Sequence, residues 1–146
     1  MANSPYSDTV FVMEFLHHLE PETILDVGAG FGRWGFLCRC HLGPGESLTV
    51  TPNQKPIIDA VEVFPRNINP VYDAVYNNTW RGDIQDVLPN LGKYDVIICG
   101  HIIEHIEKKE AWRMIENLRM HCRKALVLCL PFHDSLRGPV CGNERE

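Results

Sequence analysis

Three glycines at alternate positions, directly after a short apolar segment, constrain this sequence more than any other feature. Residues 24–27 are apolar except for Asp26, and Gly28, Gly30 and Gly32 follow. Glycine tolerates positive φ angles and lets the backbone approach a ligand, so an apolar strand followed by such a loop and a helix is typical of nucleotide sites in α/β sheets. The pattern therefore predicts that a strand of a parallel sheet ends here at a ligand-binding loop.

The spacing of the glycines indicates which kind of nucleotide the loop accepts. A dinucleotide fingerprint requires a third glycine at the position of Arg33, so the loop does not match that of NAD enzymes. Asp26 lies two residues before the first glycine, and a fixed negative charge there suits an ammonium or sulfonium group better than a pyrophosphate. We therefore expect S-adenosylmethionine (SAM), which combines an adenosine with a cationic sulfur and has no phosphate.

Apolar patterning predicts alternating helices and strands along the rest of the chain. Phe11, Phe15 and Leu19 repeat at four-residue spacing, with Val12 and Leu16 beside them, and predict an amphipathic helix with one apolar stripe. The predicted strands span 24–27, 57–63, 80–84, 94–99 and 124–130, the predicted helices span 8–19, 33–42 and 107–122, and 65–78 is ambiguous. This alternation predicts an α/β, Rossmann-like, doubly wound fold: a mostly parallel sheet of about five strands with helices on both faces.

Specific burial predictions concern the last helix, the last strand and the cysteines. Strand 124–130 is apolar after Lys124 and is predicted to be buried on both faces. Cys99 and Cys129 lie inside apolar runs and are expected to be buried, reduced thiols. The predicted buried face of the last helix consists of Ala111, Ile115, Leu118 and Cys122, and Trp112 widens it.

Polar residues follow the predicted strands where ligands bind in such sheets. Glu62 and Val63 end the second strand, and the Glu62 carboxylate can accept hydrogen bonds from both ribose hydroxyls. Asp83 can accept from the adenine amino group, and Ile84 can pack on its ring. Each carboxylate also has a structural alternative: Glu62 as a solvated charge, Asp83 as a helix cap, and Asp26 as an acceptor for loop amides.

His101 comes directly after the predicted fourth strand and is the candidate catalytic residue. It is expected to face the sulfonium region, as a cofactor contact and as a general base if the acceptor carries a proton of high pKa. A structural histidine is the alternative, and Glu104 and His105 are expected to cap or pack. The H-x-x-E-H spacing also resembles an inverted zinc-peptidase motif, but a glycine-rich nucleotide loop is the wrong context for it.

Composition narrows the choice of partners and location. The net charge of -5 implies no strong field for nucleic acids. The sequence lacks an 18-residue apolar run and a signal peptide, which predicts a cytoplasmic protein without a membrane span. The segment from Cys38 to His41 does not have standard zinc spacing, so no metal site is predicted, and a metal cluster that adds His121 and Cys122 is the alternative.

Taken in order, these motifs resemble those of class I SAM-dependent methyltransferases over about residues 22–132. Residues 24–32 resemble the family's first motif, Glu62 its acidic second motif, Gly82-Asp83 its third, and residues 94–105 its fourth. The resemblance implies a SAM cofactor and methyl transfer to an unidentified acceptor, expected to be a small molecule. A SAM- or nucleoside-binding module without catalysis is the alternative, and a nucleotide-sugar or NAD enzyme is the third hypothesis.

The end of the chain departs from the family's pattern. Sheets of that family usually have seven strands and finish with an antiparallel pair, whereas this chain ends soon after the fifth predicted strand. We expect one domain over 1–146 with a core at about 22–132 and a polar tail at 133–146, either a fragment or a minimal form. An uncovered edge of strand 124–130 predicts a homodimer, or coverage by the tail.

Overall fold

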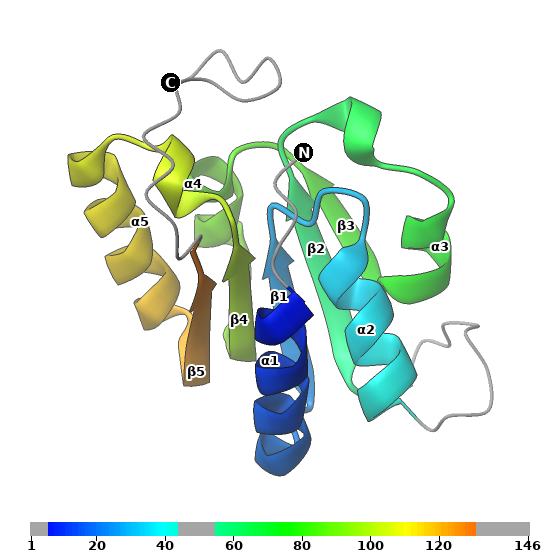
Figure 1. The fold of residues 1–146 in the computed structure, drawn as a ribbon. Coiled ribbons are helices and arrows are strands. Elements are labelled where there is room, and N and C mark those ends of the chain that lie inside the picture. The colour runs from blue at the N-terminus through cyan, green and yellow to red at the C-terminus, as the bar shows by residue number, and fades with distance from the viewer. Residues whose placement is uncertain (1–5, 44–54, 131–146) are drawn as a thin grey trace.

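The computed structural model describes residues 6–43 and 55–130, and within them five parallel strands form one sheet (Figure 1). The order across the sheet is β3-β2-β1-β4-β5, and each neighbouring pair is parallel. The strands are β1 (Thr23–Val27), β2 (Ile57–Glu62), β3 (Asn78–Arg81), β4 (Tyr94–Gly100) and β5 (Cys122–Cys129). The predicted α/β fold is confirmed.

Helices cover both faces of this sheet (Figure 1). One face carries α1 (Tyr6–Leu19), α2 (Arg33–Leu42) and α3 (Val71–Val75); the other carries α4 (Ile84–Val87) and α5 (Lys108–Met120). Single 3-10 turns lie at Pro65–Asn67, Leu88–Asn90 and Ile103–His105. None of the helices in the described ranges has the length and apolar character that crossing a membrane requires.

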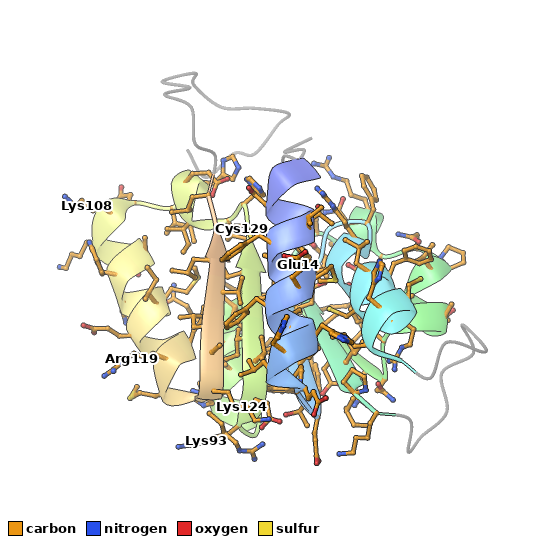
Figure 2. All side chains as sticks on the ribbon, turned by 60° about the horizontal axis from the view of Figure 1, so that its bottom comes forward. Glu14, Lys93, Lys108, Arg119, Lys124 and Cys129 are labelled. Atoms are coloured by element: carbon orange, nitrogen blue, oxygen red, sulfur yellow. The ribbon has the colours of Figure 1, made fainter. Side chains whose placement is uncertain are left out.

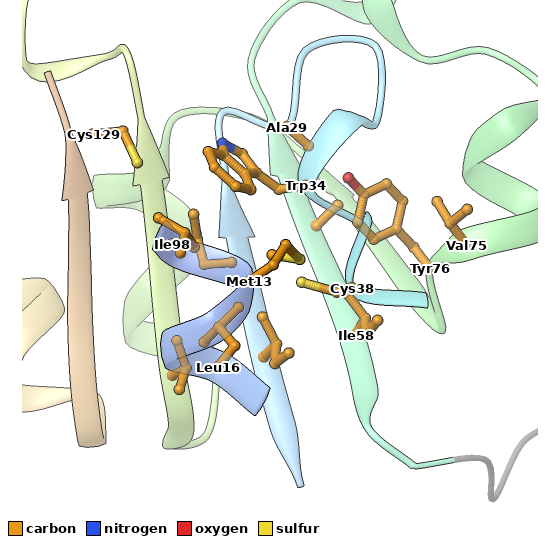
Figure 3. Packing of buried hydrophobic residues seen from close by; sticks show 14 of the residues in the cluster. Met13, Leu16, Ala29, Trp34, Cys38, Ile58, Val75, Tyr76, Ile98 and Cys129 are labelled. Atoms are coloured by element: carbon orange, nitrogen blue, oxygen red, sulfur yellow. The ribbon is translucent and has the colours of Figure 1, made fainter. Parts of the chain in front are cut away.

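Alternation along the central strands divides the core into two clusters. Ile24 and Ile98 belong to the cluster under α1, α2 and α3, whereas Leu25 and Ile97 belong to the cluster under α4 and α5. Figure 3 shows the first cluster, where Leu16 of α1 packs near the middle of the sheet. Strands buried on both faces are mostly apolar, which explains the hydrophobic residues of β1 and β4 on either side of Asp26 and Asp95.

The strand order reverses between β1 and β4. From β1 the chain continues to β2 and β3 on one side, and then returns to β4 and β5 on the other. Val27 pairs with Val61 of β2 and with Cys99 of β4, so the carboxyl ends of the three strands meet at one edge. Ligands of doubly wound sheets bind at such a switch point.

The buried faces of two helices match the prediction only in part. Phe11 is 72% exposed and Phe15 is also exposed, whereas Val12 and Leu16 are buried. With 3.6 residues per turn, Val12 and Leu16 lie on the same face as Leu19, which packs partly against the core, and the phenylalanines are rotated away from it.

The prediction for α5 is confirmed for Ala111 and Leu118, whereas Ile115 is only partly buried. Its buried residues are Ala111, Met114 and Leu118, whereas Trp112 is 60% exposed and does not widen the buried face. Figure 2 shows the charged side chains of Lys108 and Arg119 on the outer side of this helix. The helix ends at Met120, so Cys122 begins β5 instead of ending the helix.

The third and fifth strands also differ from their predicted forms. β3 ends at Arg81, because Asp83 caps α4 and Ile84 is already its first residue. Only Cys129 of β5 is buried, since β5 is an edge strand with one neighbour in the described sheet, so the prediction of burial on both faces is wrong. The predictions for the tail at 133–146 lie outside the described residues.

Candidate functional site

The predicted glycine loop forms at the carboxyl end of β1. Gly28, Gly30 and Gly32 all have positive φ angles, of 64°, 59° and 89°, which glycine adopts without the penalty that a side chain carries. The Gly28 amide donates to the Val61 carbonyl of β2 at 2.8 Å, and Gly32 leads directly into α2. The loop therefore curls over the switch point and presents its backbone there.

Glu62 anchors this loop. Its Oε2 accepts a 2.7 Å hydrogen bond from the Gly30 amide, and its Oε1 accepts a 2.8 Å hydrogen bond from the Phe64 amide. The Tyr72 hydroxyl donates to the Gly30 carbonyl at 2.8 Å, so both polar groups of Gly30 have partners. Glu62 is 3% exposed, which makes the alternative of a solvated charge wrong.

Asp26 lies beneath the loop as a buried carboxyl group, one of whose oxygens has no partner among the described residues. The residue is 1% exposed, and its Oδ2 accepts hydrogen bonds from the Tyr76 hydroxyl at 2.6 Å and the Gly35 amide at 3.2 Å. Oδ1 is buried without a hydrogen-bond partner among the described residues. Such an oxygen fits a cationic group of a bound ligand, because an orphaned buried acceptor is unfavourable.

Burial controls the protonation of this carboxyl group. It raises the pKa of Asp26 to about 7, against the hydrogen bonds from Tyr76 and Gly35, which lower it, and the Glu62 charge raises it further. Burial and the Asp26 charge raise the pKa of the Tyr76 phenol well above its ordinary value, so Tyr76 stays a donor. Near neutral pH, Asp26 is thus close to the midpoint of its titration.

The aromatic residues that hold Asp26 and Gly30 were not among the residues predicted from sequence. Tyr72 and Tyr76 pack with ring centroids 4.8 Å apart, and both come from the stretch that was ambiguous in sequence. A Cβ on Gly35 would lie 2.6 Å from the Tyr76 hydroxyl oxygen, so α2 approaches this ring only because residue 35 is a glycine. The four-residue spacing of Tyr72 and Tyr76, which puts them on one face of a helical turn, is the one sequence signal for this pair.

His101 follows β4 in an unusual conformation. It is a non-glycine residue with a φ of 55°, and its side chain is 6% exposed. Its Nδ1 lies 3.1 Å from Oε1 of Glu104, whereas Nε2 is buried without a hydrogen-bond partner in the described part of the chain. The expected cap or packing role of Glu104 is thus a contact with His101 itself.

The residues on either side of His101 pack against the glycine loop and α2. Ile102 contacts Gly28 so closely that a Cβ there would lie 2.8 Å from its Cγ1. A Cβ on Gly100 would lie 2.5 Å from Nε1 of the Trp34 indole. The first and fourth motifs, which are far apart in sequence, are therefore in direct contact.

Two buried thiols near the ends of β4 and β5 feel the charges of Asp26 and Glu104. Cys99 and Cys129 are both buried, as predicted. Burial, together with the Glu104 and Asp26 charges, raises the pKa of Cys99 to about 12 and contributes to a pKa of about 11 for Cys129. Both thiols stay protonated at neutral pH.

The residues after β3 lie farther along the same edge. Oδ1 of Asp83 accepts a 2.9 Å hydrogen bond from the Gln85 amide, which caps α4, and Ile84 is buried in the second core cluster. The Gly82 amide donates to the Glu62 carbonyl at 3.1 Å, and Val63 follows Glu62 directly. Asp83 thus has the structural role that the sequence left open, and its role toward adenine stays a prediction.

The described residues do not form a zinc site of either kind considered from the sequence. No three His, Cys, Asp or Glu side chains there lie close enough to hold one metal ion. His101 directly follows β4, which ends at Gly100, and His105 ends a single 3-10 turn, so the H-x-x-E-H segment does not lie on one helix.

Several solved structures share this architecture. Magnesium protoporphyrin IX methyltransferase (ChlM) from Synechocystis PCC 6803 with bound SAM is 19% identical, with a TM-score of 0.59 over 84% of this chain and 56% of that chain. The O-methyltransferase TomG from Streptomyces achromogenes in complex with SAM is 10% identical, with a TM-score of 0.61 over 86% and 56%. This chain has the class I SAM-dependent methyltransferase fold.

The methyltransferase fold is recognised from structure and not from overall sequence similarity. No protein-family model and no curated protein matches the sequence. A SAM dependent methyltransferase from Archaeoglobus fulgidus is 15% identical, with a TM-score of 0.56 over 82% of this chain and 51% of that chain. The chain thus spans slightly more than half the length of these structures, and the methyltransferase fold alone leaves ligand and acceptor open.

Proposed function

We propose that this chain binds SAM and transfers its methyl group to a small-molecule acceptor. The observation that carries the proposal is the buried Oδ1 of Asp26 beneath the glycine loop, which no described residue partners. A ligand that places a cation over this oxygen supplies the missing partner, and SAM carries both an ammonium and a sulfonium group. The SAM-bound ChlM and TomG structures, which share the fold, support this choice of ligand.

Each candidate residue has a role in this proposal. Asp26 binds the cationic end of the ligand, and Glu62 binds the ribose through lone pairs that its two amide partners leave open. His101 lies at the reacting end. The remaining proposed cofactor contacts are Gly28, Gly30, Gly32, Val63, Asp83 and Ile84.

The chemistry requires little covalent work from the protein. SAM supplies a methyl group on a positively charged sulfur. The loop and the end of β4 hold donor and acceptor in line and exclude water, which raises the rate through positioning. His101 accepts a proton at Nε2 when the acceptor carries one.

Calorimetry and product analysis test the two parts of the proposal separately. We expect SAM and its demethylated product, S-adenosylhomocysteine (SAH), to bind at least about ten-fold more tightly than NAD, because the loop lacks the third glycine of the dinucleotide fingerprint. Tighter binding of NAD would contradict the proposal. Binding of SAM without SAH formation across a panel of acceptors would support the alternative of a binding module.

A further inference from the structure

We propose that Glu104 is a positioning residue that holds the His101 imidazole with Nδ1 protonated and Nε2 free to accept a proton from the methyl acceptor. The inference rests on the proposed methyl transfer. The inference goes beyond methyl transfer by naming the group that fixes the tautomer of His101. The tautomer in turn indicates the class of methyl acceptor.

The contact between the two side chains determines which nitrogen carries the proton. His101 Nδ1 lies 3.1 Å from Glu104 Oε1, and the side chains are only 6% and 20% exposed. An ionised carboxylate can only accept hydrogen bonds, so Nδ1 must be the donor. In a neutral imidazole this leaves the lone pair on Nε2.

That lone pair has no partner among the described residues. Nε2 is buried and accepts no hydrogen bond from any of them. A buried acceptor without a donor is unfavourable, and so is the positive φ of 55° at His101. Two unfavourable features at one residue are expected where a ligand supplies the missing donor.

The position of His101 fits that role. Ile102 packs on Gly28 of the glycine loop, and Gly100 packs under the Trp34 indole, so the residues on both sides of His101 lie against the proposed SAM site. Asp26 pairs with Ile98 of β4 and Val27 with Cys99, so His101 follows β4 at the same edge of the sheet as the Asp26 carboxyl group.

The proposed step balances without a further reactant. The acceptor heteroatom bonds to the methyl carbon as the bond from that carbon to sulfur breaks, and the electron pair of the broken bond stays on sulfur. His101 Nε2 takes the proton that the acceptor loses and later releases it to water. An acceptor with an O–H or N–H group, an alcohol, phenol or amine, therefore fits this site.

Nitrogen-15 NMR of the full chain with bound SAH tests the tautomer directly. At about pH 8.5, above the ordinary pKa of imidazole, we expect His101 to show a protonated Nδ1 and an unprotonated Nε2. In Glu104→Gln, whose amide can donate as well as accept, we expect this single tautomer to be lost and both tautomers to be populated. His101→Gln assigns the signal.

Controls separate this inference from the proposed function. Glu107→Gln, an exposed residue whose side chain does not cap α5, is expected to leave the His101 tautomer and SAH affinity unchanged. A protonated Nε2 in the unmodified chain, or an unchanged tautomer in Glu104→Gln, would overturn the inference while SAH still binds. Failure of the unmodified chain to bind SAH would instead overturn the proposed function.

Discussion

At the scale of single residues, the site is built around carboxyl groups that burial keeps from water. Asp26 and Glu62 are both almost fully buried, and both accept hydrogen bonds from backbone amides near the glycine loop. They differ in their free acceptors: both Glu62 oxygens have amide partners, whereas Oδ1 of Asp26 has none among the described residues. Of the two residues, Asp26 is therefore the one whose buried oxygen lacks a partner in the described part of the chain.

The raised pKa of Asp26 predicts a pH-dependent cost in stability. Because its pKa is about 7 in the folded chain, against 3.8 for an ordinary aspartate, the folded chain holds this proton more tightly than the unfolded chain does. The contribution of this bound proton to the free energy of unfolding is fully present below about pH 4. It is lost as the pH rises through 7, and the total loss is roughly 4 kcal/mol. Asp26→Asn cannot ionise and does not lose this contribution. In urea unfolding, its free energy of unfolding relative to that of the unmodified chain should therefore rise from about pH 5 to about pH 8. An equal difference at both pH values would argue against this pKa.

Glu62→Ala is expected to weaken both the fold and the ligand site. The Gly30 and Phe64 amides lose their acceptor, which costs about 1–3 kcal/mol of unfolding free energy for buried donors. The loss of a charged acceptor should weaken SAM binding by about 1.5–3 kcal/mol. Thermal melts without ligand and calorimetry with SAM measure the two effects, and unchanged SAM affinity would place Glu62 outside the ribose site.

At the scale of elements, α2 and α3 hold the glycine loop from one side. Arg39 of α2 is buried and donates to the carbonyls of Val75 and Pro56 and to Oδ1 of Asn77. These contacts tie α2 to the end of α3 and to the start of β2. Tyr72 of α3 and Tyr76 directly after it can therefore reach the loop and Asp26 in a fixed position.

Substitution of two glycines in this region is predicted to destabilise the chain to different degrees, and at Gly30 also to affect binding. Among the described residues, a Cβ on Gly30 would meet only the Gly28 carbonyl, at 3.9 Å. Gly30→Ala should therefore lower the free energy of unfolding by about 1 kcal/mol, because of the positive φ at this position. Its methyl group would project into the space proposed for the ligand. At Gly35 a Cβ would collide with Tyr76, so Gly35→Ala should destabilise the chain more. Melting temperatures and SAM affinities of the two variants test this. The prediction fails if Gly30→Ala binds SAM normally.

Which elements were predictable follows from what determines them. The runs of β1, β2 and β4 are apolar because both faces are buried, so their positions and the loop after β1 could be predicted from sequence. The face of α1 could not, because apolar residues surround much of the helix and only packing selects Val12 and Leu16 over Phe11. The contacts of Tyr76 with Asp26 and of Glu104 with His101 depend on tertiary placement, which no local pattern encodes.

At the scale of the whole molecule, β5 gives the described sheet an exposed edge. Most of its residues are partly exposed, and Leu128, with Leu130 just beyond the strand, is among the exposed large hydrophobic residues. We expect this edge to be paired or covered in solution, with a homodimer as the favoured form. Light scattering over a range of concentrations should show a rising mass, and β5 amides should exchange slowly with deuterium. A strict monomer with rapidly exchanging β5 amides would contradict the prediction.

The switch in strand order also has a mechanical consequence. Among the described residues, the ladder between Ile24–Val27 of β1 and Val96–Cys99 of β4 alone joins the sheet's two parts, β3-β2-β1 and β4-β5. In the proposed function, the ligand would bind across this junction, between the loop after β1 and the residues after β4. Bound ligand would therefore link the two parts of the sheet. The mechanical force needed to separate β1 from β4 should rise with ligand concentration.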